Sequence, residues 1–384
     1  MVGLLAVIYI VFISLGLPDS LFGVAWPVMH VEFGVFERFA SFYSIIIGLC
    51  TGGVSFFSGR LIRKFGTGRV TFVSTLLTVI GMVGMSFAPN LLVLMVFAVV
   101  MGYGAGAIDT GLNNFVSLHY EARHMNWLHC FWGVGVTLSP MIMSVFLKED
   151  NGGWRDGYRV VALLQFLIAL LVLVTLKKWR VEQQPPQEET VVTEKKGLFA
   201  ILRTAGVVPS IFSLGLYCAG EFMVGTWGAT YAVNAFAASP DAAARWVSLY
   251  YGGIMLGRMA AGFASVKLSD GKLIRLGMAI AAVGMVLLVL PLGTVSLCGL
   301  LLVGFGYGPV FPCVLHSIPA RFGSAYSADI TGYHMGGAYA IGFAVQLAYG
   351  YVASATSFFI TPFVLGGLCI SVLIANRLAE RKCS

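Results

Sequence analysis

Twelve apolar segments run through the 384-residue sequence, each long enough to cross a lipid bilayer as a helix, which takes about 20 residues. An unpaired backbone group in lipid costs several kcal/mol, so only helices or closed barrels span membranes. These segments lack the polar and apolar alternation of barrel strands. The sequence therefore predicts an all-α integral membrane protein with twelve transmembrane helices. We place the crossings at residues 3–29, 38–58, 69–87, 91–118, 124–147, 158–177, 206–233, 245–266, 273–292, 294–317, 326–350 and 356–378.

The distribution of charge predicts how the chain lies in the membrane. Only 11% of residues are charged, against about 25% in soluble domains, which excludes a soluble enzyme. The net charge of +7 therefore reflects membrane topology, and no nucleic-acid partner is expected. Because Lys and Arg gather in cytoplasmic loops, we expect both termini in the cytoplasm and a multi-pass protein of a cell membrane, the bacterial inner membrane. Of the 24 Lys and Arg residues, the loops of the opposite side hold only Arg38, Lys148, Arg155, Arg159 and Arg245.

A polar segment, residues 178–204, interrupts the apolar pattern with Pro185, Pro186 and a run of Glu and Gln. We interpret it as a cytoplasmic linker. It divides the chain into an N-terminal six-helix bundle, residues 1–177, and a C-terminal six-helix bundle, residues 205–384.

The two halves resemble each other at an offset of 202 residues. The glycines 102, 104 and 106 recur as glycines 304, 306 and 308. The same offset relates Asp19 to Glu221 and Gly23 to Gly225. A duplicated six-helix unit predicts two pseudo-symmetric bundles that face each other across a central site and rock to expose it alternately.

Asp19 is an acidic residue in the middle of an apolar segment, where a charge costs at least about 2.5–3.5 kcal/mol. It follows Pro18 in GLPDSLFGVAWP, so we expect a kink or unwound turn at the acid. Helical spacing puts Trp26 on the same face, where its ring could stack on a ligand. Asp19 and Trp26 are therefore candidate substrate-binding residues, and Asp19 is also a candidate for proton coupling. The alternative is an acid that serves packing alone.

Asp109 lies on a face that begins with Gly102 and Gly106 and continues to Asn113, with Asn114 at its edge. Small residues at one end and hydrogen-bonding groups at the other predict a helix that leans on a neighbour and faces a wet cavity. A carboxyl group in a low-dielectric cavity is protonated more easily than in water. We therefore predict that Asp109 carries a proton and that both asparagines bind substrate; a packing seam is the alternative.

Glu221 and Arg258 are the ionisable residues inside the helices of the second half. Glu221 could couple protons or bind substrate, or it could neutralise Arg258, because charges inside membranes usually pair. We interpret Arg258 as a structural anchor. The other candidate substrate ligands offer rings or hydrogen-bonding groups, and packing is the alternative role for each: His129, Trp132, Trp227, Tyr231, Tyr307, Tyr333, His334 and Gln346.

Other classes of protein fit the sequence less well. Gly271 and Lys272 lack the remaining residues of a phosphate-binding loop, so ATP hydrolysis is not expected. An intramembrane aspartyl protease could use Asp19 and Asp109 as a dyad, but the GxGD motif of that class is absent, because Gly106 precedes Asp109 by three residues without the second glycine. A channel or a scaffold does not explain matching acids in a duplicated layout. We predict no enzymatic activity, no catalytic residues, no cofactor and no metal.

The segment GRLIRKFGTGR, residues 59–69, resembles the loop between the second and third helices of the major facilitator superfamily. Gly59 and Lys64 fit the motif as structural residues, whereas Arg63 stands where the family has an Asp. The stretches GLPDSLFGVAWP, GYGAGAIDTGLNNF and GFGYGPVFP are similar to the fucose/galactose/glucose symporter group. In its fucose permease branch, an Asp and a Glu serve substrate binding and proton coupling, and Asp19 and Asp109 match those positions.

The resemblance implies the major facilitator fold and the import of a sugar or similar polar solute together with a cation. We expect that cation to be a proton rather than sodium. The runner-up is a proton-driven exporter of drugs or amphipathic metabolites. We expect a monomer whose partners are the small-molecule substrate, the co-transported ion and the lipid bilayer.

Overall fold

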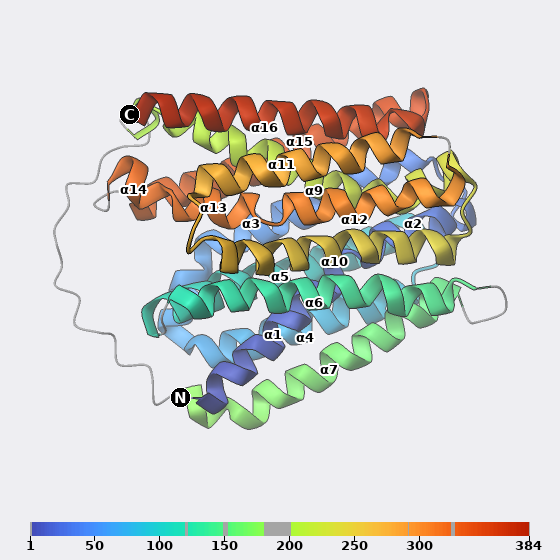
Figure 1. Cartoon of the computed structure of the whole chain (residues 1–384). Helices are drawn as coiled ribbons and strands as arrows, with labels where there is room; N and C mark the ends of the chain where they lie inside the picture. Colours follow the sequence, from blue (N-terminus) through green and yellow to red (C-terminus); the bar gives the residue numbers. More distant parts are fainter. Residues whose placement is uncertain are drawn as a thin grey trace. The chain divides into compact units, whose positions relative to one another are not determined.

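The computed structural model describes residues 2–119, 122–148, 153–179, 201–290, 292–323 and 327–383 (Figure 1). Within these ranges all regular structure is helical. The first half contains α1 (Val2–Asp19), α2 (Leu21–Glu32), the 3-10 helix η1 (Glu37–Phe39), α3 (Ala40–Phe65), α4 (Thr67–Ser86), α5 (Leu91–His119), α6 (Ala122–Phe146) and α7 (Gly153–Trp179). The second half contains α9 (Val207–Phe236), α10 (Pro240–Ala264), α11 (Asp270–Val289), η2 (Gly293–Leu297), α12 (Cys298–Tyr307), α13 (Val310–His316), α14 (Ile318–Phe322), α15 (Ser327–Ala355), η4 (Phe358–Ile360) and α16 (Thr361–Cys383).

The predicted all-α architecture is confirmed, because each predicted crossing coincides with one helix or with an interrupted run of helices. The first crossing is α1 followed by α2, and the tenth is η2 followed by α12 and α13. Nine helices of the described chain are long and apolar enough to cross a membrane by length and composition alone. The helices α3, α10 and α15 are the predicted crossings outside that set.

The described residues fall into two compact units. One lies within Met1–Gln187 together with Gly225–Ser248, and we call it unit 1. The other lies within Glu188–Val224 together with Leu249–Ser384, and we call it unit 2. The predicted division at residues 178–204 stays a prediction, because most of that segment lies outside the described residues.

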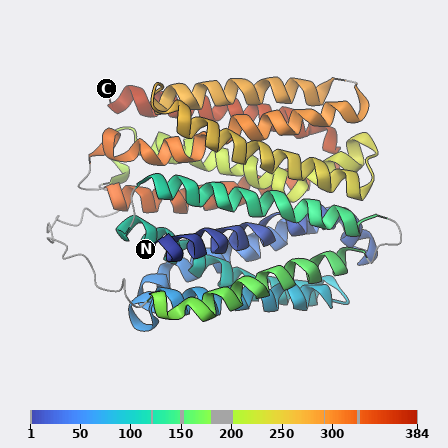
Figure 2. The same cartoon turned by 60° about the horizontal axis from the view of Figure 1, so that its bottom comes forward.

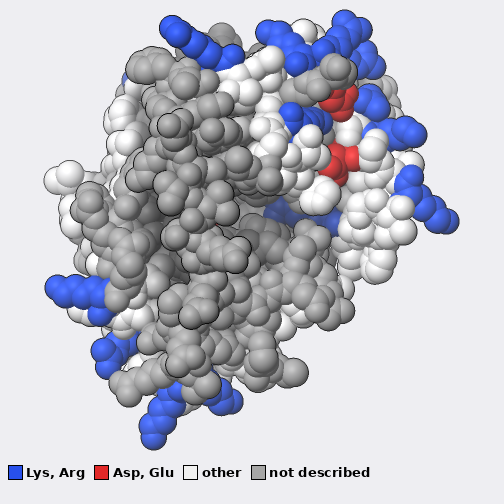
Figure 3. Space-filling view, turned by 90° about the vertical axis from the view of Figure 1, so that its left-hand side faces the viewer, with Lys and Arg blue, Asp and Glu red and all other residues white. Residues whose placement is uncertain are grey.

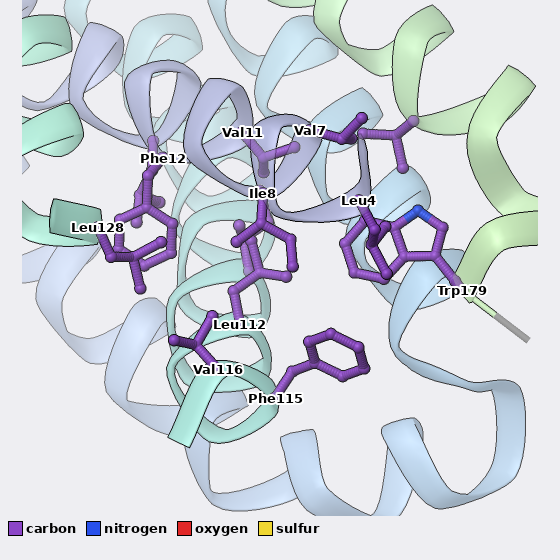
Figure 4. Packing of buried hydrophobic residues seen from close by; sticks show 13 residues of the cluster. Leu4, Val7, Ile8, Val11, Phe12, Leu112, Phe115, Val116, Leu128 and Trp179 are labelled. Carbon is purple, nitrogen blue, oxygen red and sulfur yellow. The ribbon is translucent and has the colours of Figure 1, made fainter. Parts of the chain in front are cut away.

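Unit 1 has an apolar core built from four helices. One side of α1 contributes Leu4, Ile8 and Phe12, and they pack against α5, α6 and the end of α7 (Figure 4). Leu112 from α5 and Trp179 from α7 lie in the same cluster (Figure 4). Each buried side chain of this size contributes roughly 1.5–3 kcal/mol when it leaves water. This core fixes α1 against α6. It thereby positions Asp19, which is the last residue of α1.

The glycines of α5 bring this helix against two neighbours at once. A methyl group at Gly102 would lie 2.7 Å from Cys50 Cβ on α3, and one at Gly106 would overlap the backbone of Thr51. A methyl group at Gly104 would lie 2.6 Å from the carbonyl oxygen of Ser74 on α4. Small residues permit such close approach between membrane helices, so the prediction that this helix leans on a neighbour is confirmed.

Unit 2 repeats the arrangement with the corresponding helices. Gly304 packs against the carbonyl oxygen of Tyr250 on α10, and a methyl group at Gly308 would lie 2.6 Å from the backbone nitrogen of Arg258. Gly306 packs instead against the backbone of Gly277 on α11. The outer glycines of each triplet thus contact one helix and the middle glycine contacts the next, as in unit 1. The predicted internal repeat is confirmed at the level of helix contacts.

Candidate functional site

The first membrane helix is interrupted at the predicted acid. Asp19 is the last residue of α1, Pro18 precedes it, and α2 begins at Leu21. Ser20 lies in the interruption, where its Oγ donates to the carbonyl oxygen of Val136 at 3.0 Å and lies 2.9 Å from Ser139 Oγ. The predicted kink is confirmed, and hydrogen bonds to α6 hold it in place.

Asp19 is exposed although the chain on both sides of it is buried. Residues 14–18 and 20–27 are all buried, so the carboxylate borders an open space in the middle of an apolar helix. Trp132 of α6 donates its indole Nε1–H to Asp19 Oδ2 at 2.8 Å. The structure thus joins two residues that the sequence predicts separately. An acid in this position is stable where it faces a polar cavity rather than lipid.

Trp26 lies in a different environment from Asp19, although helical spacing places both on one face. The Trp26 side chain is fully buried, and its Nε1–H donates to the backbone carbonyl oxygen of Glu37 at 2.8 Å. Its ring packs on Phe22 and on His30. The indole therefore fixes η1 against α2 in this structure.

Asp109 is half-buried on α5 and forms a hydrogen-bonded pair with the predicted neighbour. Asn113 Nδ2 donates to Asp109 Oδ1 at 2.8 Å and to the Asp109 carbonyl oxygen at 3.0 Å. Among the described residues, the buried Asn113 Oδ1 has no hydrogen-bond partner, so it remains available as an acceptor. The side chain of Asn114 lies outside the described residues.

Further polar and aromatic groups line the contact between α1 and α6. His129 is half-buried, and its ring lies edge-on to Phe12 with 6.0 Å between ring centroids. Tyr9, which is not among the predicted ligands, forms a hydrogen bond through its hydroxyl with His124 Nδ1 at 2.7 Å and stacks on Phe131. Both pairs follow from the parallel course of two helices remote in sequence, which periodicity within one helix cannot reveal.

In unit 2, Glu221 and Arg258 form a buried ion pair. Glu221 Oε2 lies 3.8 Å from Arg258 Nη2, and the two side chains are only 9% and 8% exposed. Arg258 Nη2 also donates to the hydroxyl of Tyr217 at 3.4 Å, and the guanidinium lies over the ring of Phe311. Tyr217 and Phe311 are absent from the predicted ligands, although Tyr217 precedes Glu221 by one helical turn.

The remaining candidates of unit 2 are mostly buried in helix contacts. His334 is fully buried, with Nδ1 2.8 Å from the carbonyl oxygen of Ile330 and Nε2 2.8 Å from Ser210 Oγ. Tyr307 is buried, and its ring centroid lies 5.5 Å from that of Tyr217. Gln346 of α15 is buried, whereas Tyr333 is half-buried and packs on an apolar cluster at the start of α9.

A second segment of unit 1, Gly225–Ser248, packs onto α2, α3 and α6 and contains Trp227 and Tyr231, both buried. The repeat-related glycines meet here, because a methyl group at Gly23 would overlap the carbonyl oxygen of Gly225. Hydrogen bonds reinforce this contact. They are Ser44 Oγ to Thr226 Oγ1 at 3.1 Å, Asn234 Nδ2 to Glu37 Oε1 at 3.0 Å and Ser248 Oγ to the Thr137 carbonyl oxygen at 2.7 Å.

The structure describes few side-chain contacts for the loop motif at residues 59–69. The surroundings of Gly59 and the side chain of Arg63 lie outside what the structure describes, and Lys64 is exposed with its Nζ over the ring of Phe65. Within the described chain, no group of three or more His, Cys, Asp or Glu side chains could hold a metal ion.

The family follows from the sequence as a whole. The model of the Major Facilitator Superfamily matches residues 8–347, and the chain belongs to this family. It is therefore a multi-pass membrane protein that belongs to a family of transporters rather than of enzymes, as the sequence predicts.

Two relatives illustrate the range of named functions. The niacin transporter NiaP of Acinetobacter baylyi is 29% identical over 34% of this chain, and the match spans 29% of its own length. The glucose/mannose transporter GlcP of Bacillus subtilis is 23% identical over 75% of this chain and 66% of its own.

Solved structures confirm the fold. The D-xylose-proton symporter has a TM-score of 0.75 at 14% identity and covers 98% of this chain and 96% of its own. The transporter FucP in the outward conformation has a TM-score of 0.64 at 15% identity and covers 98% of each chain. The predicted major facilitator fold is confirmed.

Proposed function

We propose that the protein is a secondary active transporter that imports a sugar with a proton by alternating access. The observation that carries this proposal is the exposed Asp19 carboxylate, held by the Trp132 indole at the interruption of a buried membrane helix. A carboxylate inside a membrane helix costs free energy unless it contacts polar groups. Sugar hydroxyls can donate to such a carboxylate.

The chemistry of unit 1 fits a sugar. A carboxylate accepts hydrogen bonds from hydroxyl groups, an amide both donates and accepts, and an indole offers a flat apolar surface. Asp19, Asn113 and Trp132 supply these three groups. The GlcP relative, named for glucose and mannose, supports the same class of substrate.

Asp109 is the residue that we propose to carry the proton. It is half-buried, and among the described side chains it forms no ion pair with Lys or Arg. A low-dielectric environment favours the neutral form of a carboxyl group, and the Asn113 amide is positioned to respond to its protonation state. A substrate that binds only the protonated form must in return raise the affinity for the proton.

The packing of the Gly225–Ser248 segment supports alternating access. Its contacts with α2, α3 and α6 bring the backbones of Gly23 and Gly225 against each other. A solute can pass between these two backbones only if this contact breaks, because they lie too close to leave a passage. Three hydrogen bonds at the contact are of a strength that can be exchanged for bonds to water.

The orientation is also a proposal. Among the described residues drawn in Figure 3, Lys and Arg side chains are more numerous than Asp and Glu side chains. Because positive charge gathers in cytoplasmic loops, we place the Lys- and Arg-rich loops and both termini in the cytoplasm. We also propose that the protein works as a monomer in a bacterial inner membrane.

Uptake into proteoliposomes tests the function. We expect radiolabelled hexoses or pentoses to accumulate when the outside is made acidic, and not with a sodium gradient alone. Asp19→Asn should reduce uptake strongly because the carboxylate is lost, whereas Asp156→Asn, at an exposed pair with Arg159, should leave it unchanged. Absence of uptake of every sugar, or proton-driven efflux of amphipathic drugs, would refute sugar import and favour the exporter.

A further inference from the structure

A groove of about 430 Å³ runs between α11 and α16 in unit 2. The two helices lie side by side in both views (Figures 1 and 2). The groove exists because small residues line its walls, Ala279 and Ala282 on α11 and Gly366 on α16. A methyl group at Gly366 would find only Met285 Sδ, at 3.9 Å. The walls of this groove are almost wholly apolar.

The groove opens onto a surface that faces acyl chains in a membrane. Val286 and Ile370 line it and are 61% and 60% exposed, and Ile374 beside it is 55% exposed. Exposed apolar side chains on both helices define a lipid-facing surface in a multi-pass protein. A hydrocarbon chain is the ligand that matches such walls.

One mouth of the groove is basic. Arg275 lies five residues after the start of α11 and Arg377 six before the end of α16, and both line the groove. At 1.5 Å per residue they lie within about 10 Å of the helix ends, near the level of lipid headgroups. Both arginines can thus meet a phosphate whose acyl chain occupies the groove.

The charges at this mouth do not cancel. Glu380 is shared by Arg275, at 3.2 Å, and Arg321, at 3.4 Å. Asp270 faces His316, whose Nδ1 lies 2.9 Å from its Oδ2. Arg377 is exposed and has no ion pair within the described chain. The mouth keeps a positive charge that favours an anionic headgroup over a zwitterionic one.

We propose that this groove is a binding site for an anionic phospholipid, with one acyl chain between α11 and α16 and the phosphate at Arg275 and Arg377. The site lies on the lipid-facing side of unit 2, and it does not depend on which solute is transported. A bound lipid would link α11 to α16 through its phosphate, at the end that carries Arg275 and Arg377.

Competition between phosphatidylglycerol and phosphatidylcholine tests the site. The full-length protein is delipidated in mild detergent, offered both lipids in equal amounts and examined by native mass spectrometry. We expect several-fold more phosphatidylglycerol than phosphatidylcholine on the wild type. Arg377→Gln should reduce that preference by about fivefold, the value of one basic residue at a lipid surface. Arg381→Gln, a basic residue of the same helix end outside the groove, should not.

Variants that fill the groove separate this site from other lipid contacts. Gly366→Leu and, independently, Ala282→Leu should abolish retained phosphatidylglycerol while the melting temperature stays near that of the wild type. The proposal is overturned by equal retention of both lipids on the wild type, or by full retention in either folded filled variant. It is also overturned by a wild-type dimer that Ala282→Leu converts to a monomer, because a second copy would then occupy the groove.

Discussion

At the scale of single residues, the charged side chains inside the membrane helices separate into two kinds. Asp19 is exposed and accepts a hydrogen bond from the Trp132 indole, whereas Glu221 and Arg258 are both buried and paired. An exposed carboxylate can exchange its hydrogen-bond partners for a ligand or for water. The second resembles a structural pair, in which removal of one member leaves an uncompensated charge.

We predict that Glu221→Gln and Arg258→Gln each lower the free energy of unfolding by about 3–5 kcal/mol, because each leaves its partner buried without a counter-charge. The double variant should regain part of that loss, since no charge then remains. Thermal unfolding in detergent measures this. Arg245→Gln is the matched control, because Arg245 is 51% exposed in its pair with Asp241 and such pairs contribute at most about 1 kcal/mol. Strictly additive losses in the double variant would show that Glu221 and Arg258 are not coupled.

The sequence predicts the residues of the site better than their surroundings. Asp19, Asp109 and Arg258 stand out because charge is costly in an apolar segment. Helical periodicity also places Asn113 beside Asp109, since both lie on one helix. Helical periodicity cannot reveal what covers Trp26, because its hydrogen-bond partner Glu37 lies in η1, outside the helix that contains Trp26.

At the scale of helices, the glycine triplets decide how closely neighbours approach. In each unit two glycines face one helix and the middle glycine faces another. The sequence reveals the repeated spacing, and the structure shows which neighbours it serves. The sequence treats 294–317 as one helix, whereas the structure has η2, α12 and α13 there, since Pro309 follows Gly308 and cannot supply a backbone donor.

We predict that Gly304→Ala destabilises unit 2 by about 1–3 kcal/mol, because the added methyl group meets the Tyr250 carbonyl oxygen and must push α12 from α10. Gly262→Ala in α10 is the control. Nothing described lies within 4 Å of its added methyl group, so the change should be neutral or stabilising by up to about 1 kcal/mol. Melting temperatures in detergent compare the two. Equal effects of both substitutions would contradict the packing role of Gly304.

At the scale of the whole molecule, duplication explains why one pattern of contacts recurs in both units. Gly16 of unit 1 packs on α6, and Gly215 of unit 2 packs on the corresponding helix, α15. The duplicated halves have nevertheless diverged at their acids, Asp19 and Glu221. Sequence comparison finds the repeat from glycines and acids, but it cannot tell which acid has acquired a cationic partner from a neighbouring helix.

The central claim is that proton binding at Asp109 drives accumulation of the substrate, and Asp109→Asn tests it most directly. Asn imitates the protonated acid in shape and neutrality but cannot release a proton. In proteoliposomes loaded with unlabelled sugar, the variant should still exchange internal for external labelled sugar at a rate within about tenfold of the wild type, because binding and rocking remain. With a pH gradient, acid outside, it should equilibrate the sugar and not concentrate it. Accumulation against the sugar gradient by Asp109→Asn would contradict the account and move the coupling to another acid or to sodium.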